Sequence, residues 1–124
     1  MLVLCRRVIA GLLKESIEKK KRMKTVSVYD YKRAGSEAML HCPDIALVEI
    51  PEKYGFPAAE TLAVCEEIKK ASAGCRIVLL CPEQDSESVY ICTEEKKRGG
   101  IADFLFYDST VEYLIAKLDA LLPA

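Results

Sequence analysis

Five short apolar runs alternate with five amphipathic segments along this chain of 124 residues, and no other feature constrains the fold as much. The runs occupy residues 2–5, 25–29, 45–50, 77–81 and 103–107. Runs of four to six residues rich in aliphatic and β-branched side chains are typical of buried strands. The run at 25–29 alternates polar and apolar residues, which favours a strand at the edge of a sheet.

Each run is followed by a segment with helical periodicity. In the first, from Val8 onward, helical spacing relates Ile9, Leu12, Leu13, Ser16 and Ile17, which predicts an amphipathic helix to about residue 20. Later helices are expected at 36–40, 57–71, from 85 or 86 to 97 or 98, and from 111 to the proline at 123. Strands alternating with helices predict an α/β fold of the (βα)5 type, in which a parallel five-stranded sheet carries helices on both faces.

Local signals place several helix ends. Pro57 suits the first turn of a helix, because its missing N–H has no partner there in any case. Asp85 or Ser86 is expected to cap the fourth helix, and the glycine pair that starts at Gly99 to end it. Ser109 has the spacing of a capping box before the fifth helix.

Length and composition limit the classes of protein to consider. The chain is expected to form one domain over residues 1–124, and its apolar runs are too short to cross a bilayer. The first five residues lead directly into Arg6 and Arg7 with no small-residue cleavage site, so no secretory signal is expected. We therefore expect a cytoplasmic protein without membrane contact.

Six cysteines occur, but no pair has C-x-x-C spacing and most lie inside apolar runs. They are expected to be reduced and mostly structural. The single histidine, His41, lies beside Cys42 without a second pair that would complete a zinc site. No metal is expected, and adjacent residues rarely form a Cys–His catalytic dyad.

The formal net charge of −1 conceals an asymmetry. Residues 1–54 contain 11 Lys and Arg against 7 Asp and Glu, whereas the rest of the chain contains 7 against 12. Much of the basic excess comes from the run at 19–22 and from Lys24. Because this run lacks aromatic residues and falls at a helix end, it predicts a solvated helix terminus rather than direct nucleic-acid binding.

Three segments carry a resemblance to a known family: 43–50 (PDIALVEI), 77–81 (IVLLC) and 99–107 (GGIADFLFY). In order and spacing, over essentially the whole chain, the sequence resembles the receiver domain of bacterial two-component response regulators, the CheY-like family. The resemblance implies the strand order 2-1-3-4-5 and a place in phosphorelay signalling. In that family two acidic residues and an aspartate hold magnesium, the aspartate accepts a phosphoryl group, and a hydroxyl and a lysine bind the phosphoryl oxygens.

Mapped onto this chain, the resemblance places other residues at all five positions. The acidic pair falls on Cys5 and Arg6, the phosphoacceptor on Glu49, the hydroxyl on Cys81 and the lysine on Tyr107. A thiol is a poor magnesium ligand, and an arginine brings a permanent positive charge to the position of the cation. We therefore expect the Mg²⁺ site to be lost and no cofactor to take its place.

Two alternatives follow for Glu49. Either Arg6 pairs with it in place of the metal ion, or Glu49 is a solvated carboxylate at the end of a strand. The first predicts a receiver held in one state without phosphorylation, acting as a protein-interaction or regulatory module and not as an enzyme. The other readings are a receiver that is still phosphorylated through altered ligands, and the regulatory part of a DNA-binding response regulator.

The resemblance also implies a protein partner, either a histidine kinase, an output protein or a second copy, at the face formed by the fourth helix, fifth strand and fifth helix. Phe104 occupies the family's aromatic switch position, and Tyr90 is the best interface candidate. Phe104 and Phe106 are expected to lie in the core. A thiol sensor built from Cys5 and Cys81 is less favoured, because two strand spacings of about 4.8 Å exceed disulfide reach.

Overall fold

The computed structural model describes residues 1–20, 24–52 and 58–122. The strands are β1 (Leu2–Val3), β2 (Ser27–Val28), β3 (Ile45–Glu49), β4 (Arg76–Cys81) and β5 (Asp103–Phe106). The helices are α1 (Arg7–Lys20), α2 (Ala34–His41), α3 (Ala58–Ala71), α4 (Ser86–Arg98) and α5 (Val111–Leu121), with a 3₁₀ turn, η1 (Tyr31–Arg33), before α2. The expected alternation of strands and helices is confirmed.

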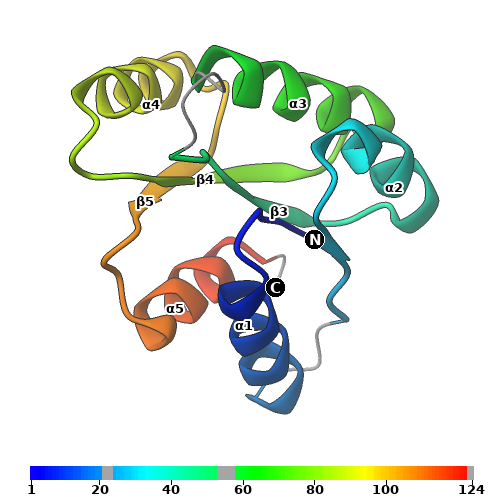
Figure 1. Cartoon of the computed structure of the whole chain (residues 1–124). Coiled ribbons are helices and arrows are strands. Elements are labelled where there is room, and N and C mark those ends of the chain that lie inside the picture. The colour runs from blue at the N-terminus through cyan, green and yellow to red at the C-terminus, as the bar shows by residue number, and fades with distance from the viewer. Residues whose placement is uncertain (21–23, 53–57, 123–124) are drawn as a thin grey trace.

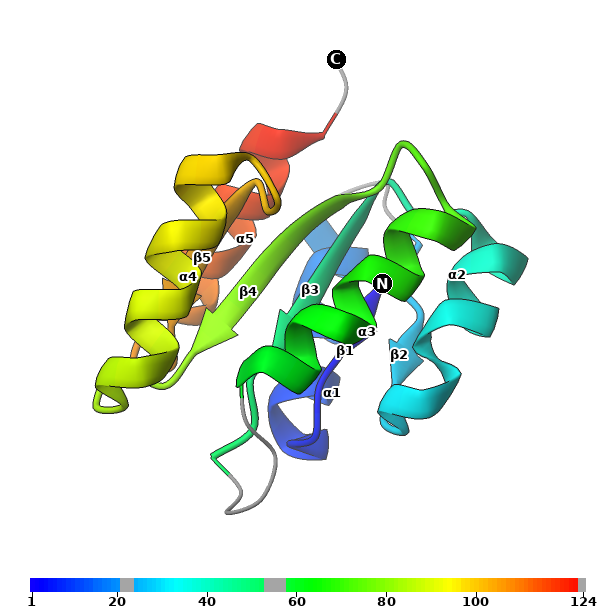
Figure 2. The ribbon, with the colours of Figure 1, turned by 90° about the horizontal axis from the view of Figure 1, so that it is seen from above.

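All strand pairs are parallel, and the strand order is β2-β1-β3-β4-β5. Helices α2, α3 and α4 cover one face of the sheet, and α1 and α5 cover the other (Figure 1). Figure 2, a view from the side of α2, α3 and α4, shows these three helices across the sheet. The doubly wound (βα)5 prediction is therefore confirmed, including the order 2-1-3-4-5.

Two apolar clusters hold the layers together, one on each face of the sheet. Alternate residues of the central strands enter different clusters: Leu79 packs with α3 and α4, whereas Leu80 packs with α1 and α5. Both are almost completely buried. This two-sided burial explains why the central strands consist of continuous apolar residues instead of an alternating pattern.

Helix α1 buries a narrower stripe than its sequence predicts. Ala10, Leu13 and Ile17 are buried against the sheet and α5, but Leu12 is 48% exposed and Val8 is 75% exposed. The reason is geometric, since only one side of a helix can face the sheet and these two residues lie on the other. The prediction that Leu12 belongs to the buried stripe is wrong.

The first two strands are shorter than predicted, with two residues each. Backbone pairing nevertheless extends beyond them, because the Leu2 N–H donates to Val26 O at 2.7 Å and the Leu4 N–H to Val28 O at 3.2 Å. Strand β2 lies at the edge of the sheet, as expected. Helix α2 is longer than the predicted 36–40 and ends at His41; the next residue, Cys42, caps it in the left-handed conformation (φ 46°) just before Pro43.

Two of the predicted helix caps are confirmed and one is wrong. Asp85 accepts a hydrogen bond from the Glu87 N–H, and Gly99 ends α4 in the left-handed conformation (φ 78°) that glycine adopts without strain. The cap of α5 is Thr110, not Ser109: its hydroxyl accepts from the Tyr113 N–H, while the Ser109 N–H donates to Phe106 O in the preceding turn. Pro57, Pro123, Lys21 and Arg22 lie outside the described residues.

Candidate functional site at the carboxyl edge of the sheet

Glu49, the last residue of β3, lies at the centre of the carboxyl edge of the sheet. Its side chain is completely buried, and the guanidinium Nε of Arg6 donates to its Oε2. The Arg6 side chain itself is 38% exposed. Of the two alternatives for Glu49, the ion pair with Arg6 is present. The alternative of a solvated Glu49 is wrong, because solvent does not reach the carboxylate.

The loop between β1 and α1 holds the second oxygen of this carboxylate. Oε1 of Glu49 accepts from the backbone N–H of Cys5 at 3.0 Å and of Arg6 at 3.2 Å, and the Cys5 thiol lies 3.3 Å away. The Arg6 carbonyl then accepts from the Ala10 N–H, which starts α1. Glu49 thus satisfies backbone donors just ahead of a helix that has no acidic residue in its first turn.

Tyr107, just after β5, reaches across the edge to β3. Its hydroxyl donates to the Ile50 carbonyl, and the Arg6 guanidinium carbon lies 4.0 Å from the centre of its ring. A cation over an aromatic face is attracted by the electrons of the ring. Tyr107 therefore supports both members of the site, Arg6 from one side and the end of β3 from the other.

Tyr31 belongs to the same edge and was missed by the sequence analysis. It lies in η1, three residues beyond the end of the edge strand β2, and its hydroxyl donates to the Glu49 carbonyl at 2.5 Å. The available signal was its position, since a residue that follows a parallel strand lies at the carboxyl edge. Two tyrosines, one from each side, thus hold the end of β3.

Burial dominates the acid–base properties of the groups around Glu49. It raises the pKa of the Cys5 thiol, and the charge of Glu49 and its hydrogen bond to the thiol add to the effect. Burial likewise raises the pKa of Tyr31 and of Tyr107, again with the Glu49 charge contributing. Cys5 is therefore a protonated thiol at neutral pH, which is a poor nucleophile.

Cys81 lies at the end of β4 but is not brought into this cluster. Its side chain is completely buried in the apolar layer beneath α3 and α4, and its thiol donates to the Pro82 carbonyl at 3.6 Å. The neighbouring Cys92 thiol lowers the pKa of Cys81, whereas the Cys81 thiol and burial raise the pKa of Cys92. Because β3 separates β1 from β4, Cys5 and Cys81 are not neighbours, and all six cysteines are free.

These residues do not fit a magnesium ion. A hard cation needs several free oxygen ligands, whereas the one buried carboxylate, Glu49, already accepts hydrogen bonds at both of its oxygens. The Arg6 guanidinium brings a positive charge to the same position. Nowhere in the described part of the chain do three His, Cys, Asp or Glu side chains gather into a group that could hold a metal ion.

The aromatic residues of α4 and β5 divide between core and surface. Phe104 is partly buried against the cluster beneath α3 and α4, and its ring meets that of Phe106 edge-on at 5.8 Å. Phe106 is 37% exposed, so its predicted core position is wrong, because the edge strand β5 leaves its last residues uncovered. Tyr90 is 66% exposed, as an interface candidate must be.

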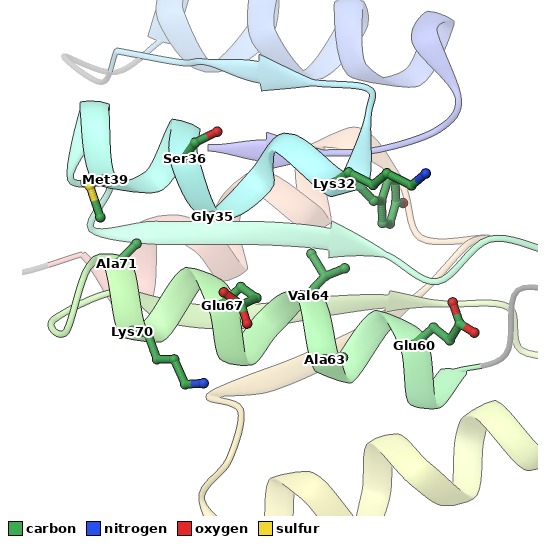
Figure 3. A pocket seen from close by; sticks show the side chains of 11 residues that line it. Lys32, Gly35, Ser36, Met39, Glu60, Ala63, Val64, Glu67, Lys70 and Ala71 are labelled. Carbon is green, nitrogen blue, oxygen red and sulfur yellow. The ribbon is translucent and has the colours of Figure 1, made fainter.

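A hollow with a volume of about 700 Å³ lies between α2 and α3 (Figure 3), and Tyr31, whose hydroxyl donates to the Glu49 carbonyl, is one of the residues that line it. Gly35, Met39, Val64 and Ala71 provide much of its apolar lining, with Lys32 and Glu60 at one end. It is a surface depression between two helices that pack closely at Gly35. His41, at the end of α2, pairs with Glu37 on its own helix at 3.2 Å and takes no part in the carboxyl edge.

No protein-family model and no curated protein sequence matches this chain, but many solved structures share its fold. The receiver domain of the Francisella response regulator 1452 matches with a TM-score of 0.75 at 17% identity, over 97% of this chain and 92% of that one. The Vibrio cholerae chemotaxis protein CheY4 matches with a TM-score of 0.75 at 14% identity, over 98% and 95%. A streptococcal redox sensor from a family that evolved from two-component response regulators has a TM-score of 0.76 at 16% identity, over 97% and 49%.

Among the described residues, no helix is long and apolar enough to span a bilayer. At identities below 25%, the structural matches establish the fold and leave the chemistry to the site itself. The chain has the fold of the receiver domains of two-component response regulators, with the strand order of the CheY-like family.

Proposed function

We propose that this chain is a pseudo-receiver: a protein-interaction module of two-component signalling whose conformation does not depend on phosphorylation. The observation that carries the proposal is the complete burial of Glu49 with both carboxylate oxygens bound, one by Arg6 and the other by the β1–α1 loop. In the mapping from the family resemblance, Arg6 supplies an internal cation at a position that serves the metal ion in receivers. Without a divalent cation, phosphoryl transfer loses its main source of charge neutralisation.

The tyrosines support a site that is held in one state. Tyr31 and Tyr107 hydrogen bond to consecutive backbone carbonyls, those of Glu49 and Ile50, and so fix the point at which the chain leaves β3. The ring of Tyr107 also lies against Arg6. A signal acting at this edge would have to break several buried interactions together, which favours a constitutive module over a switch.

The test of this proposal is incubation with acetyl phosphate and magnesium, followed by mass spectrometry of the intact protein. We expect no phosphoryl adduct on the natural chain. A variant with Cys5→Asp, Arg6→Asp and Glu49→Asp has the acidic residues of the family at all three positions and is the matched comparison for metal binding. An adduct on Glu49 of the natural chain would instead identify a receiver that is phosphorylated through altered ligands.

Magnesium binding is followed separately by nuclear magnetic resonance. We expect the amide signals of Cys5, Arg6 and Glu49 to stay unchanged during a magnesium titration, because a guanidinium already occupies the carboxylate. Shifts confined to these three amides would overturn the proposal. Shifts spread over exposed acidic residues such as Glu66 would report weak surface binding and leave the proposal in place.

A partner is proposed at the face formed by α4, β5 and α5. Each of these elements carries one exposed aromatic residue, namely Tyr90, Phe106 and Tyr113. Aromatic side chains are enriched at protein interfaces. A photoreactive amino acid placed at Tyr90 is expected to cross-link the partner in cells of the natural source, whereas one placed at Leu40 on α2, which is equally exposed, is not.

A further inference from the structure

Helix α1 has large apolar residues on the side that faces away from the sheet. Val8 is 75% exposed and Leu12 is 48% exposed, one helical turn apart, and the exposed Gly11 lies beside them. Figure 1 shows α1 and α5 as the only layer on this side of the sheet. Two neighbouring apolar side chains left in solvent on one stripe of a helix suggest a surface that another molecule covers.

Packing among the described residues does not explain why position 11 is a glycine. A Cβ atom built at this position meets nothing within 4 Å, so the chain's own packing does not require glycine there. Glycine in the middle of a helix is less stable than alanine, because it loses more backbone freedom on folding. A reason outside the monomer is close approach of a second backbone at this point, which a side chain would prevent.

The charges on the same helix are self-complementary. Arg7 lies four residues before Gly11 and Glu15 lies four residues after it, and both are exposed. In an antiparallel pair of α1 helices centred on Gly11, Arg7 of each copy meets Glu15 of the other. The Arg7 guanidinium carbon lies 4.1 Å from the centre of the Tyr29 ring, which holds this cation in the first turn of α1. The helix dipole disfavours a cation there, so a partner carboxylate on the open side of the guanidinium would add a favourable interaction.

We propose that two copies of this chain associate through the outer faces of α1, antiparallel and centred on Gly11. Val8 and Leu12 of both copies then lie together near the centre of the contact, and the two Arg7–Glu15 pairs close its ends. A twofold axis makes every contact occur twice, which is the arrangement that closed dimers use. The inference is independent of the proposed function, because it uses no residue of the Arg6–Glu49 site.

The dimer is expected to be weak. A contact confined to one helix face is smaller than the roughly 1,600 Å² that a standard stable interface buries. We therefore expect a dissociation constant on the order of 100 µM, which sedimentation equilibrium can resolve in samples of up to about 1 mM.

Charge reversal tests the antiparallel arrangement. Arg7→Glu places two glutamates opposite each other at both ends, and Glu15→Arg places two arginines there, so each single variant should weaken dimerisation by about tenfold. The double variant Arg7→Glu with Glu15→Arg restores both pairs with opposite polarity and should recover most of the affinity. Glu66→Arg, on α3 across the sheet, is the matched control and should change nothing.

Gly11→Gln provides a second measurement that separates association from folding. Glutamine favours a helix more than glycine does, so the midpoint of thermal unfolding should stay the same or rise, whereas the longer side chain should abolish the dimer. A natural chain that sediments as a monomer at the highest concentration would overturn the proposal. So would a double charge reversal that remains as weak as the single variants, since the surface would then suit a different partner or geometry.

Discussion

The carboxyl edge of the sheet and the outer face of α1 depart from the usual distribution of side chains in opposite directions. At the edge, the carboxylate of Glu49 is completely buried, yet donors from its own chain bind both of its oxygens. On the outer face of α1, Val8 and Leu12 are apolar and lie in solvent. Burying a charge is costly unless it is paired, and exposing an apolar patch is costly unless it is covered.

The two regions differ in whether contacts within the chain compensate for the unusual placement of their side chains. The edge satisfies its polar groups internally, which fits a site that does not need a ligand to be stable. On the outer face of α1, no other segment of the described residues covers Val8 and Leu12, which fits a surface for association. Under the proposed function, this molecule acts through its surfaces and not through phosphorylation at the carboxyl edge.

The strongest test of the edge removes its cation. Arg6→Met leaves the buried Glu49 carboxylate with backbone donors alone, and we expect the free energy of unfolding in urea to fall by about 3 to 4 kcal/mol. The double variant with Glu49→Met should lose less than Arg6→Met alone, because no unpaired buried charge remains. A loss below about 1 kcal/mol for Arg6→Met would show that the pair contributes no more than a surface ion pair.

The two faces of α1 are compared by truncating adjacent leucines. Leu13, which is completely buried, should lose about 3 kcal/mol of unfolding free energy as Leu13→Ala, because the change leaves a cavity. Leu12→Ala on the outer face should lose less than about 1 kcal/mol in dilute solution and weaken self-association instead. Equal losses of stability for the two variants at low protein concentration would contradict the assignment of the faces.

The hydrogen bonds from Tyr31 and Tyr107 to the end of β3 are tested by removing one hydroxyl. Tyr107→Phe keeps the ring beside Arg6 but loses the hydrogen bond to the Ile50 carbonyl, so stability should fall by about 1 kcal/mol. Tyr90→Phe is the control, since Tyr90 is exposed and its variant should stay within about 0.5 kcal/mol of the natural chain. Chemical denaturation of both variants gives the comparison.

The smallest expected effect concerns Asp103, which joins α4 to α5 through Lys96 at 2.9 Å and Lys117 at 3.8 Å. Burial alone would raise its pKa, but the hydrogen bonds from Lys96 and from the Phe104 N–H, with the charges of both lysines, lower it. A lowered pKa in the folded state means that the carboxylate stabilises the protein above the ordinary Asp pKa. This stabilisation is lost as the pH falls through the lower folded value.

The measurement is thermal unfolding between about pH 5 and pH 2. The natural chain should lose stability faster with acid than Asp103→Asn, and the two should converge at the lowest pH. At neutral pH the difference should stay below about 1 kcal/mol, because both lysines are partly exposed to solvent. Parallel pH profiles for the two proteins would assign the acid sensitivity to other carboxylates.

Most of the fold could be predicted because its signals are local. The period of the apolar residues and the caps at Asp85 and Gly99 act within one or two turns of chain, and the structure confirms them. The cap of α5 was misplaced because Ser109 and Thr110 are both suitable residues, and only the turn before the helix selects Thr110. The order of strands came from resemblance to a family, since periodicity does not specify which strands are neighbours.

The candidate site was predictable in part. Both Arg6 and Glu49 could be placed at the carboxyl edge, because the ends of parallel strands share one edge of the sheet. Their pairing was one of two open alternatives, and the structure selects it. Tyr31 was missed because it lies three residues beyond its strand, in a 3₁₀ turn whose course depends on the packing of α2. Cys81 also lies at the carboxyl end of a parallel strand, β4, and was therefore a candidate for the same site. Its side chain instead packs beneath α4 in the apolar cluster that contains Cys92.

By itself, the sequence determined the alternation of strands and helices and the residue types at the strand ends, because hydrophobic period and chain order are properties of neighbouring residues. Only the tertiary structure decided that solvent does not reach Glu49, that two tyrosines bind the end of β3, and that Val8 and Leu12 stay uncovered. These outcomes depend on contacts between segments far apart in the chain. Burial is a property of the assembled layers, so the same side chain is core or surface according to what packs against it.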